Sequence, residues 1–297
     1  MSGPAPVPFS GLPSALRPPV ARLVGAMVPV AVMLRVHSVF DRAVNLEGAS
    51  SGVLVSLVVR PQDMAATAVL VDHLPAGVER GMPVVICGTP AAGADGPPCV
   101  VCEGSVRWEG RLGATANDSC SPEGVARRLE ALVKTHGREG GMLPLVSAAA
   151  DTPVTRFARA AIEGQGGPDW SRFVGLGIGL TPSGDDFLTG ALLAECLVAA
   201  GSARPHLPAA RRADAPGAPS GGISVDRSAV AARLGGTTAA GRTLLAAALD
   251  ERFPAYLLNL VETAIRGGAL SAEHLDHGHS SATDSVCGII ARLRMEC

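Results

Sequence analysis

The chain has 297 residues, of which 47% are apolar and only 3% aromatic, and its formal net charge is −2. A chain of this length can bury a substantial core, which Ala, Val and Leu must build because aromatic residues are scarce. The charge is nearly balanced and contains no block of one sign, so the composition does not support a nucleic-acid-binding surface.

The first segment, residues 1–20 (MSGPAPVPFSGLPSALRPPV), is rich in proline and reads as a flexible arm. It lacks the basic start and apolar block of a secretory signal peptide. The most apolar early run, residues 26–34, is too short to span a bilayer and contains Pro29. We therefore expect a soluble, cytoplasmic protein without a membrane partner.

The next segment, residues 26–112, contains short valine-rich runs separated mostly by Gly, Pro or Asp. Such runs are typical of β-strands. Six of them in under ninety residues predict a small antiparallel sheet or barrel, within a β-rich domain that spans residues 21–117. The runs are VPVAVMLRV, VFDRAVNL, GVLVSLVV, AATAVLV, MPVVIC and PCVVCEGSVRWEG.

The seven cysteines are odd in number and irregularly spaced, which argues against a secreted disulfide framework. Cys99 and Cys102 form a single CxxC pair inside one of the valine-rich runs. Because no second pair accompanies it, we interpret these cysteines as buried thiols rather than as a zinc or redox site.

Helical patterns dominate residues 118–297, so the predicted fold class is α+β, with the β domain first. Helices are expected after Ser121-Pro122, Thr152-Pro153 and Thr181-Pro182, because a hydroxyl N-cap followed by proline is a helix-start signal. Residues 201–222 are small, polar and proline-rich, and are expected to form a mobile loop. Further helices are predicted at DRSAVAARL, GRTLLAAALD, PAYLLNLVETAIR and DSVCGIIARLRM.

The stretch GLGIGLTPSGDDFLTG, residues 175–190, is richer in glycine than a helix start requires. Glycine is useful where the backbone needs a positive φ or approaches another group closely. A helix N-terminus attracts anions, and hydroxyl groups add further donors. The predicted ligand-binding residues here are Gly177, Gly179, Thr181, Ser183 and Gly184, in a loop that would suit a phosphate, carboxylate or carbamoyl-type group.

Asp185 and Asp186 allow two interpretations. Carboxylates in a first helical turn stabilise the helix dipole, which would make the stretch a structural cap. They would also repel an anion unless a metal ion or a substrate N–H group lay between them. Neighbouring helix positions differ by about 100°, so one carboxylate could face a ligand, or hold Mg²⁺, while the other holds the loop. Both remain candidate catalytic residues.

Two further loops combine glycine and hydroxyl residues before a predicted helix. One contains Thr237 and Thr238, and the other is GHSSATD, residues 278–284. Together with the first loop they predict three helix N-termini at one ligand site. The second loop contributes Ser280, Ser281 and Asp284 as ligand-binding candidates and His279 as a catalytic candidate, because histidine titrates near neutrality. Nearby His274 and His277 do not add up to a convincing zinc motif.

The stretch GLGIGLTPSGDDFLTG resembles the signature of the family of the AllH subunit of oxamate carbamoyltransferase, an enzyme of the allantoin pathway. HSVFDRAVNL, GGTTAAGRTLL and GHSSATD resemble other parts of the same family, over about residues 20–295. Ala282 stands where that family usually has glycine, and the 201–222 loop looks longer than usual. The resemblance implies carbamoyl transfer between a small amide and phosphate, together with partner subunits.

Three hypotheses follow. The chain is a carbamoyltransferase component that binds carbamoyl phosphate, or phosphate plus a small amide, alone as a homo-oligomer or with partner subunits. Alternatively, it is a non-catalytic ligand-binding or scaffolding subunit that completes a partner's site. A third possibility is a stand-alone metal-dependent enzyme acting on an amide or phosphoester. No cofactor is implied with certainty; Mg²⁺ at Asp185 or Asp186 is the candidate.

Overall fold

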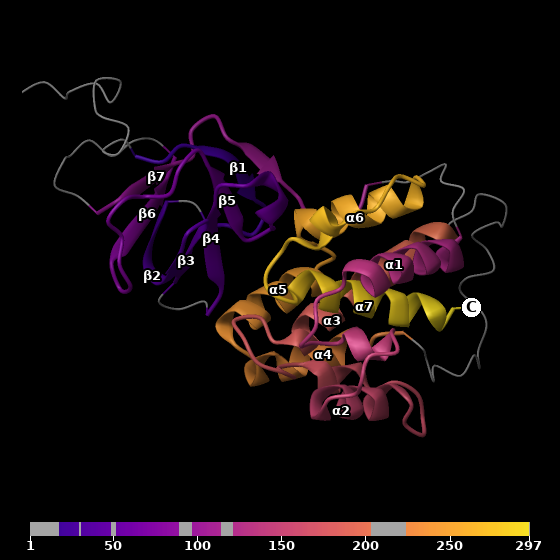
Figure 1. Ribbon diagram of the computed structural model, residues 1–297. Coiled ribbons are helices and arrows are strands. Elements are labelled where there is room, and N and C mark those ends of the chain that lie inside the picture. The colour runs from indigo at the N-terminus through magenta and orange to yellow at the C-terminus, as the bar shows by residue number, and fades with distance from the viewer. Residues whose placement is uncertain are drawn as a thin grey trace, which may run out of the picture. The chain divides into compact units, whose positions relative to one another are not determined.

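The computed structural model describes residues 18–29, 31–48, 52–88, 97–113, 121–202 and 224–296. The chain divides into two compact units, Met1–Gly110 and Arg111–Cys297 (Figure 1). The first is a β-sheet and the second is helical, which confirms the predicted α+β fold class. Most of the predicted arm (1–20), nearly all of the predicted 201–222 loop and the predicted boundary at 117 lie outside the described residues.

The first unit is an eight-stranded sheet over its described residues, with strand order β7-β6-β2-β3-β4-β5-β1-β8. The sheet is mixed rather than antiparallel throughout, because β4 and β5, β6 and β7, and β1 and β8 pair in parallel. The strands are β1 (Ala21–Gly25), β2 (Val32–Phe40), β3 (Ala43–Glu47), β4 (Leu54–Val58), β5 (Ala68–Val71), β6 (Pro83–Cys87), β7 (Cys99–Val101) and β8 (Val106–Trp108). A short 3-10 helix, η3 (Pro61–Asp63), lies between β4 and β5.

The sheet curls so that its two ends approach each other. Val20, just before β1, forms a parallel bridge with Val101 of β7, and the Val101 N–H donates to the Pro19 carbonyl at 2.9 Å. The last residues of the predicted arm therefore belong to the sheet unit. Strand β1 was not predicted, and the single strand predicted over residues 98–110 is two strands, with Gly104 at a positive φ of 73° between them.

Alternating side chains form the core of this unit, as the valine-rich pattern predicts. In β2, for example, Leu34 and Val36 are buried while their neighbours Met33 and Arg35 are exposed. Burying each such aliphatic side chain contributes about 1.5–3 kcal/mol. Apart from Cys102, the buried cluster consists of aliphatic side chains, which agrees with the scarcity of aromatic residues.

The interpretation of the CxxC pair is half wrong. Cys99 is not a free thiol, because it forms a disulfide with Cys87 across the paired strands β6 and β7. Cys102 is a buried free thiol, and burial raises its pKa. The CxxC spacing pairs Cys99 with Cys102. The pairing of β6 with β7 instead brings Cys87, twelve positions before Cys99, into bonding distance.

The second unit contains seven α-helices among its described residues, and all seven predicted helical segments form helices. They are α1 (Pro122–His136), α2 (Pro153–Ile162), α3 (Ser183–Ser202), α4 (Arg227–Arg233), α5 (Ala239–Leu249), α6 (Ala255–Ile265) and α7 (Ser281–Arg294). Short 3-10 helices occur at η4 (Leu143–Leu145), η5 (Trp170–Phe173), η7 (Leu234–Gly236) and η8 (Ala272–Leu275). None of the described helices is both long enough and apolar enough to cross a membrane.

Two of the predicted hydroxyl N-caps are observed in α1 and α2. Ser121 accepts a hydrogen bond from the Gly124 N–H at 3.2 Å. Thr152 and Thr155 form a reciprocal capping box, with Thr152 accepting at 3.2 Å and donating its N–H at 2.8 Å. Each cap satisfies an N–H group that the helix itself cannot, which stabilises a helix by about 1 kcal/mol.

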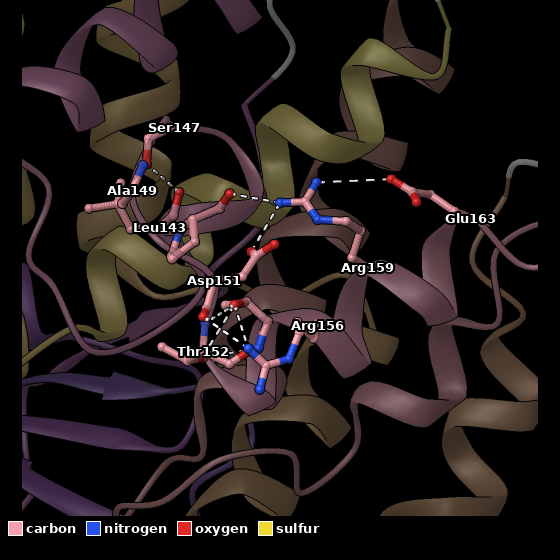
Figure 2. A network of polar contacts seen from close by, with 10 residues as sticks. Leu143, Ser147, Ala149, Asp151, Thr152, Arg156, Arg159 and Glu163 are labelled. Carbon is pink, nitrogen blue, oxygen red and sulfur yellow. Dashed lines mark hydrogen bonds and ion pairs between the residues drawn. The ribbon is translucent and has the colours of Figure 1, made fainter.

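A polar network fixes the segment that leads from η4 into α2 (Figure 2). Arg159 of α2 donates to the Pro144 carbonyl at 3.0 Å and to Asp151 at 3.2 Å. Ser147 donates to the Leu143 carbonyl at 2.9 Å, so this segment is tied to itself as well as to the helix. The network holds the chain next to Met142, whose backbone N–H reaches the site described below.

Helices α3 and α7 cross closely and form the centre of the helical unit (Figure 1). A Cβ atom at Gly190 would overlap the Ser285 carbonyl, and one at Gly288 would overlap the Phe187 carbonyl. Phe187 also stacks on Phe173, with ring centroids 4.7 Å apart. Glycine is therefore required at both positions so that the two helix backbones can approach each other.

Candidate functional site

The three predicted loops come together at the N-termini of α3, α5 and α7. The Thr181 and Ser281 hydroxyl oxygens are 3.3 Å apart, although 100 residues separate them in the sequence. Thr238 caps α5 by accepting from the Gly241 N–H at 2.9 Å, and its hydroxyl donates to the Leu180 carbonyl at 2.6 Å. The structure thus joins the first loop to both of the others.

Asp185 holds the first two loops together. Its Oδ1 accepts from the Gly175 N–H at 2.8 Å, and its Oδ2 accepts from the Thr237 hydroxyl. Its carboxylate also lies directly against Gly241, where a Cβ atom would overlap it. Burial raises the pKa of Asp185, and the two hydrogen bonds partly oppose that effect. Because both Asp185 oxygens are hydrogen-bonded to the protein, Asp185 stabilises the conformation of these two loops.

Asp186 points to a different group of side chains, as the 100° helical rotation requires. It is 2% exposed, and hydrogen bonds from the Ser281 and Thr181 hydroxyls favour its ionised form. Burial, followed by repulsion from the Asp284 carboxylate, nevertheless holds its pKa well above the usual range. Its Oδ2 atom is buried and has no hydrogen-bond partner among the described residues.

Asp284 of α7 is the counterpart of Asp186. It is completely buried, and its Oδ1 accepts from the Met142 N–H at 2.5 Å. Burial raises its pKa to about 6, although the bonds from Met142 and the Ser183 and Ser280 hydroxyls act in the opposite direction. Its Oδ2 atom also has no partner within the described part of the chain.

The contacts of Asp186 and Asp284 are reciprocal. Ser281 of α7 hydrogen-bonds to Asp186 of α3, and Ser183 of α3 hydrogen-bonds to Asp284 of α7. The same reciprocity relates Gly190 and Gly288, each of which contacts a carbonyl of the other helix. Each helix therefore contributes one Ser, one Asp and one Gly to the crossing, and these residues are related by an approximate local two-fold axis.

A short sequence repeat underlies this arrangement and was missed by the sequence analysis. Residues 183–190 read SGDDFLTG and residues 281–288 read SATDSVCG, so both have Ser-x-x-Asp-x-x-x-Gly. Spacings of three and seven place all three residues on one helix face. The repeat is detectable in the sequence, but it is too short to stand out without the helix crossing.

The glycine-rich stretch serves several purposes. Gly177 and Gly179 have positive φ values of 109° and 115°, which other residues rarely adopt. Gly184 is needed for packing, because a Cβ atom there would overlap the Phe173 carbonyl. Thr181 was expected to cap α3, but the helix begins at Ser183, and the Thr181 hydroxyl lies near Ser281 instead.

The N-terminus of α3 offers fewer free donors than expected. The Gly184 N–H donates to the Leu176 carbonyl at 2.8 Å, and the Asp185 and Asp186 N–H groups donate to the Pro182 carbonyl. The protein itself therefore uses these helix N–H groups. The half-buried hydroxyls of Thr181 and Ser281 lie at the edge of the cluster, where both hydrogen-bond to Asp186.

The three neighbouring histidines have separate environments. His279 is exposed, and its carbonyl accepts from Arg138 at 3.3 Å. Its charge lowers the pKa of Asp284, but less than the hydrogen bonds to that carboxyl do. His277 stacks on Tyr256 with ring centroids 4.1 Å apart. His274 lies 3.2 Å from the Ser271 hydroxyl within η8. His279 is therefore close enough for its charge to act on the Asp284 carboxyl.

Sequence reasoning also missed Tyr256, Ile178 and Leu180. The Tyr256 hydroxyl is 3.2 Å from the Ser285 hydroxyl, and its pKa is raised by burial and by the nearby Asp186 and Asp284 carboxyls. Ile178 is 92% exposed and Leu180 is 41% exposed. The glycine-rich loop thus presents two large apolar side chains to solvent immediately beside the hydroxyl cluster.

Residues 173–293 match the family model described as oxamate carbamoyltransferase subunit AllH. The match confirms the resemblance over α3 to α7, including all three loops, and it does not extend to HSVFDRAVNL in the sheet unit. No curated protein and no solved structure matches the chain. The residues assembled around Asp186 and Asp284 therefore lie within the part of the chain that is similar to this family.

Proposed function

We propose that this chain is a carbamoyltransferase component of the oxamate carbamoyltransferase AllH type. In this proposal it binds a small carbamoyl- or phosphate-bearing anion where the loops before α3, α5 and α7 meet. The family match supports the reaction class. The observation that carries the proposed location is the junction of Thr181 and Ser281, with hydroxyls 3.3 Å apart at the edge of two buried carboxyl groups.

Carbamoyl transfer requires donors at two places. The phosphate must be held, and the carbonyl oxygen of the carbamoyl group becomes negative as the new bond forms. The Thr181 and Ser281 hydroxyls donate to Asp186 in this structure, and by rotating they would donate to either oxygen of the ligand instead. The loop at Gly177 and Gly179 lacks side chains at two positions, so a ligand can approach its backbone closely. His279 is the exposed titratable group that we assign to proton transfer.

Partner subunits form part of the proposal. The matching family is described as a subunit, and Ile178 and Leu180 expose apolar surface beside the site. These two side chains specifically favour the alternative that the chain is a non-catalytic binding subunit, whose loop completes the site of a partner enzyme. In that case the purified chain would bind the ligand but would turn it over only when the partner is added.

The test is calorimetric titration of the purified chain with carbamoyl phosphate, followed by assays with small amides, with and without candidate partner proteins. Thr181→Val and Ser281→Ala should each weaken binding by about tenfold, the value of one hydrogen bond. Thr135→Val is the matched control, because the Thr135 hydroxyl donates within its own helix α1, to the Ala131 carbonyl at 2.9 Å.

Unchanged affinity in the two site variants would refute the proposed location. Absence of carbamoyl phosphate binding to the wild-type chain, both alone and with partners, would refute the proposed ligand. Turnover by the chain alone would exclude the non-catalytic alternative.

A further inference from the structure

Asp186 and Asp284 each leave one carboxyl oxygen without a partner in the interior of the helical unit. Both Oδ2 atoms are inaccessible to solvent and unpaired among the described residues. Buried polar atoms in folded proteins are nearly always hydrogen-bonded, so two unpaired carboxyl oxygens at one place need an explanation. An ion or ligand that binds between them would provide it.

We propose that Asp186 and Asp284 together hold a divalent, oxygen-preferring cation of the Mg²⁺ type through their Oδ2 atoms. The part of the proposal that concerns its role rests on the proposed function: the cation would lie between the two carboxylates and the bound anion. Without such a cation, the carboxylates would repel a phosphate or a developing oxyanion at the same loops.

The helix crossing explains why the two carboxyls meet. Each aspartate directly precedes the residue whose carbonyl lies against the glycine of the other helix, namely Phe187 against Gly288 and Ser285 against Gly190. Asp186 and Asp284 therefore both lie at the crossing point. The Asp284 carboxylate also raises the pKa of Asp186 by repulsion, in agreement with the two carboxyl groups being near each other.

The surrounding atoms suit a hard cation. The hydroxyls of Ser183 and Ser281 hydrogen-bond to the two carboxyls and hold them in position, and Thr181 adds a third hydroxyl on the Asp186 side. Oxygen atoms are the ligands that Mg²⁺ prefers. Asp185 is not part of this set, because the Gly175 N–H and the Thr237 hydroxyl occupy its two oxygens.

The number of protein ligands also agrees with Mg²⁺. Within the described residues, no group of three or more His, Cys, Asp or Glu side chains is arranged to hold a metal. Mg²⁺ is commonly bound by only one or two carboxylates, with water and substrate phosphate completing its octahedron. A two-aspartate site next to a phosphate-binding loop has this composition.

The direct experiment measures Mn²⁺ binding to the full-length, chelator-stripped chain by electron paramagnetic resonance, without any carbamoyl compound. We expect one Mn²⁺ per chain, displaced by Mg²⁺. Asp186→Asn and Asp284→Asn keep the side-chain shape, and each should weaken Mn²⁺ binding by at least about tenfold. Glu273→Gln is the matched control, because Glu273 is an exposed acidic residue in η8, shortly before the loop at residues 278–284.

The reciprocal geometry makes a second, more specific test possible. Ser183→Ala and Ser281→Ala should weaken Mn²⁺ binding by similar factors, about tenfold each, because each serine orients the aspartate of the opposite helix. Circular dichroism and thermal melting of the same samples show that the variants are folded. A large effect of one serine and none of the other would contradict the paired site.

The proposal is wrong if Mn²⁺ does not bind at millimolar concentration, or if the two asparagine variants bind it like the wild type. A protonated-carboxyl infrared band that is lost in Asp186→Asn and unchanged by Mn²⁺ would show that a shared proton occupies the position instead. Because these measurements use no carbamoyl compound, Mn²⁺ binding without carbamoyl phosphate binding would contradict only the proposed function, and the reverse result only the cation site.

Discussion

The raised pKa of Asp284 predicts an unusual dependence of stability on pH. In the folded, metal-free protein its pKa is raised from 3.8 to about 6, chiefly by burial. The folded state therefore retains a proton that the unfolded chain has already released between these values. Linkage then requires the free energy of unfolding to fall as pH rises through this window, and to be highest below it.

The magnitude follows from the size of the shift. Each pKa unit corresponds to 1.36 kcal/mol, so a shift of roughly two units amounts to about 3 kcal/mol. Asp284→Asn removes this titration. It also removes the repulsion that raises the pKa of Asp186, so both effects change the pH dependence of stability in the same direction. We expect the free energy of unfolding of the wild type, relative to Asp284→Asn, to fall by about 2.5 kcal/mol from about pH 4 to about pH 7.

The assay is urea unfolding of wild type and Asp284→Asn across this pH range, with a chelator present so that no cation stabilises the carboxylates. Asp226→Asn is a control of opposite sign. Asp226 caps α4, and its pKa is lowered mainly by its hydrogen bond with Ser228. Its contribution should be present at neutral pH and lost as pH falls. Parallel profiles for wild type and Asp284→Asn would refute the reasoning.

Three further substitutions test the packing around the site. Gly288→Ala should destabilise the chain by about 1–3 kcal/mol because the methyl group would meet a carbonyl of α3; Gly235→Ala, with open space around it, should leave the urea midpoint nearly unchanged. Gly184→Ala should lower the melting temperature despite the better helix propensity of alanine, since its Cβ would overlap a loop carbonyl; an increase would contradict the observed packing. Asp185→Ala should cost about 1–3 kcal/mol by leaving the half-buried Gly175 N–H without its acceptor, and a loss below about 0.5 kcal/mol would show that water replaces it.

Local sequence signals determined much of the secondary structure. Ser121 and Thr152 cap helices where predicted, because a cap depends only on residues three positions away. Valine-rich runs became strands for a similarly local reason. Strand order was not predictable in this way: the pairing of Val20 with Val101 depends on residues 81 positions apart, and the unpredicted β1 became a strand through such pairing.

The candidate site likewise has features that local sequence signals predict and features that depend on long-range contacts. Its loops were recognisable from the sequence, because glycine, hydroxyl residues and helix starts occur there within a few positions. The different roles of Asp185 and Asp186 were not, since they depend on partners about 50 and 100 residues away, Thr237 and Asp284. The sequence by itself therefore determined which residue types stand at each helix start. Only the tertiary structure, through the glycine-mediated crossing of α3 and α7, decided which carboxyl group is tied to the protein and which two keep an oxygen unpaired.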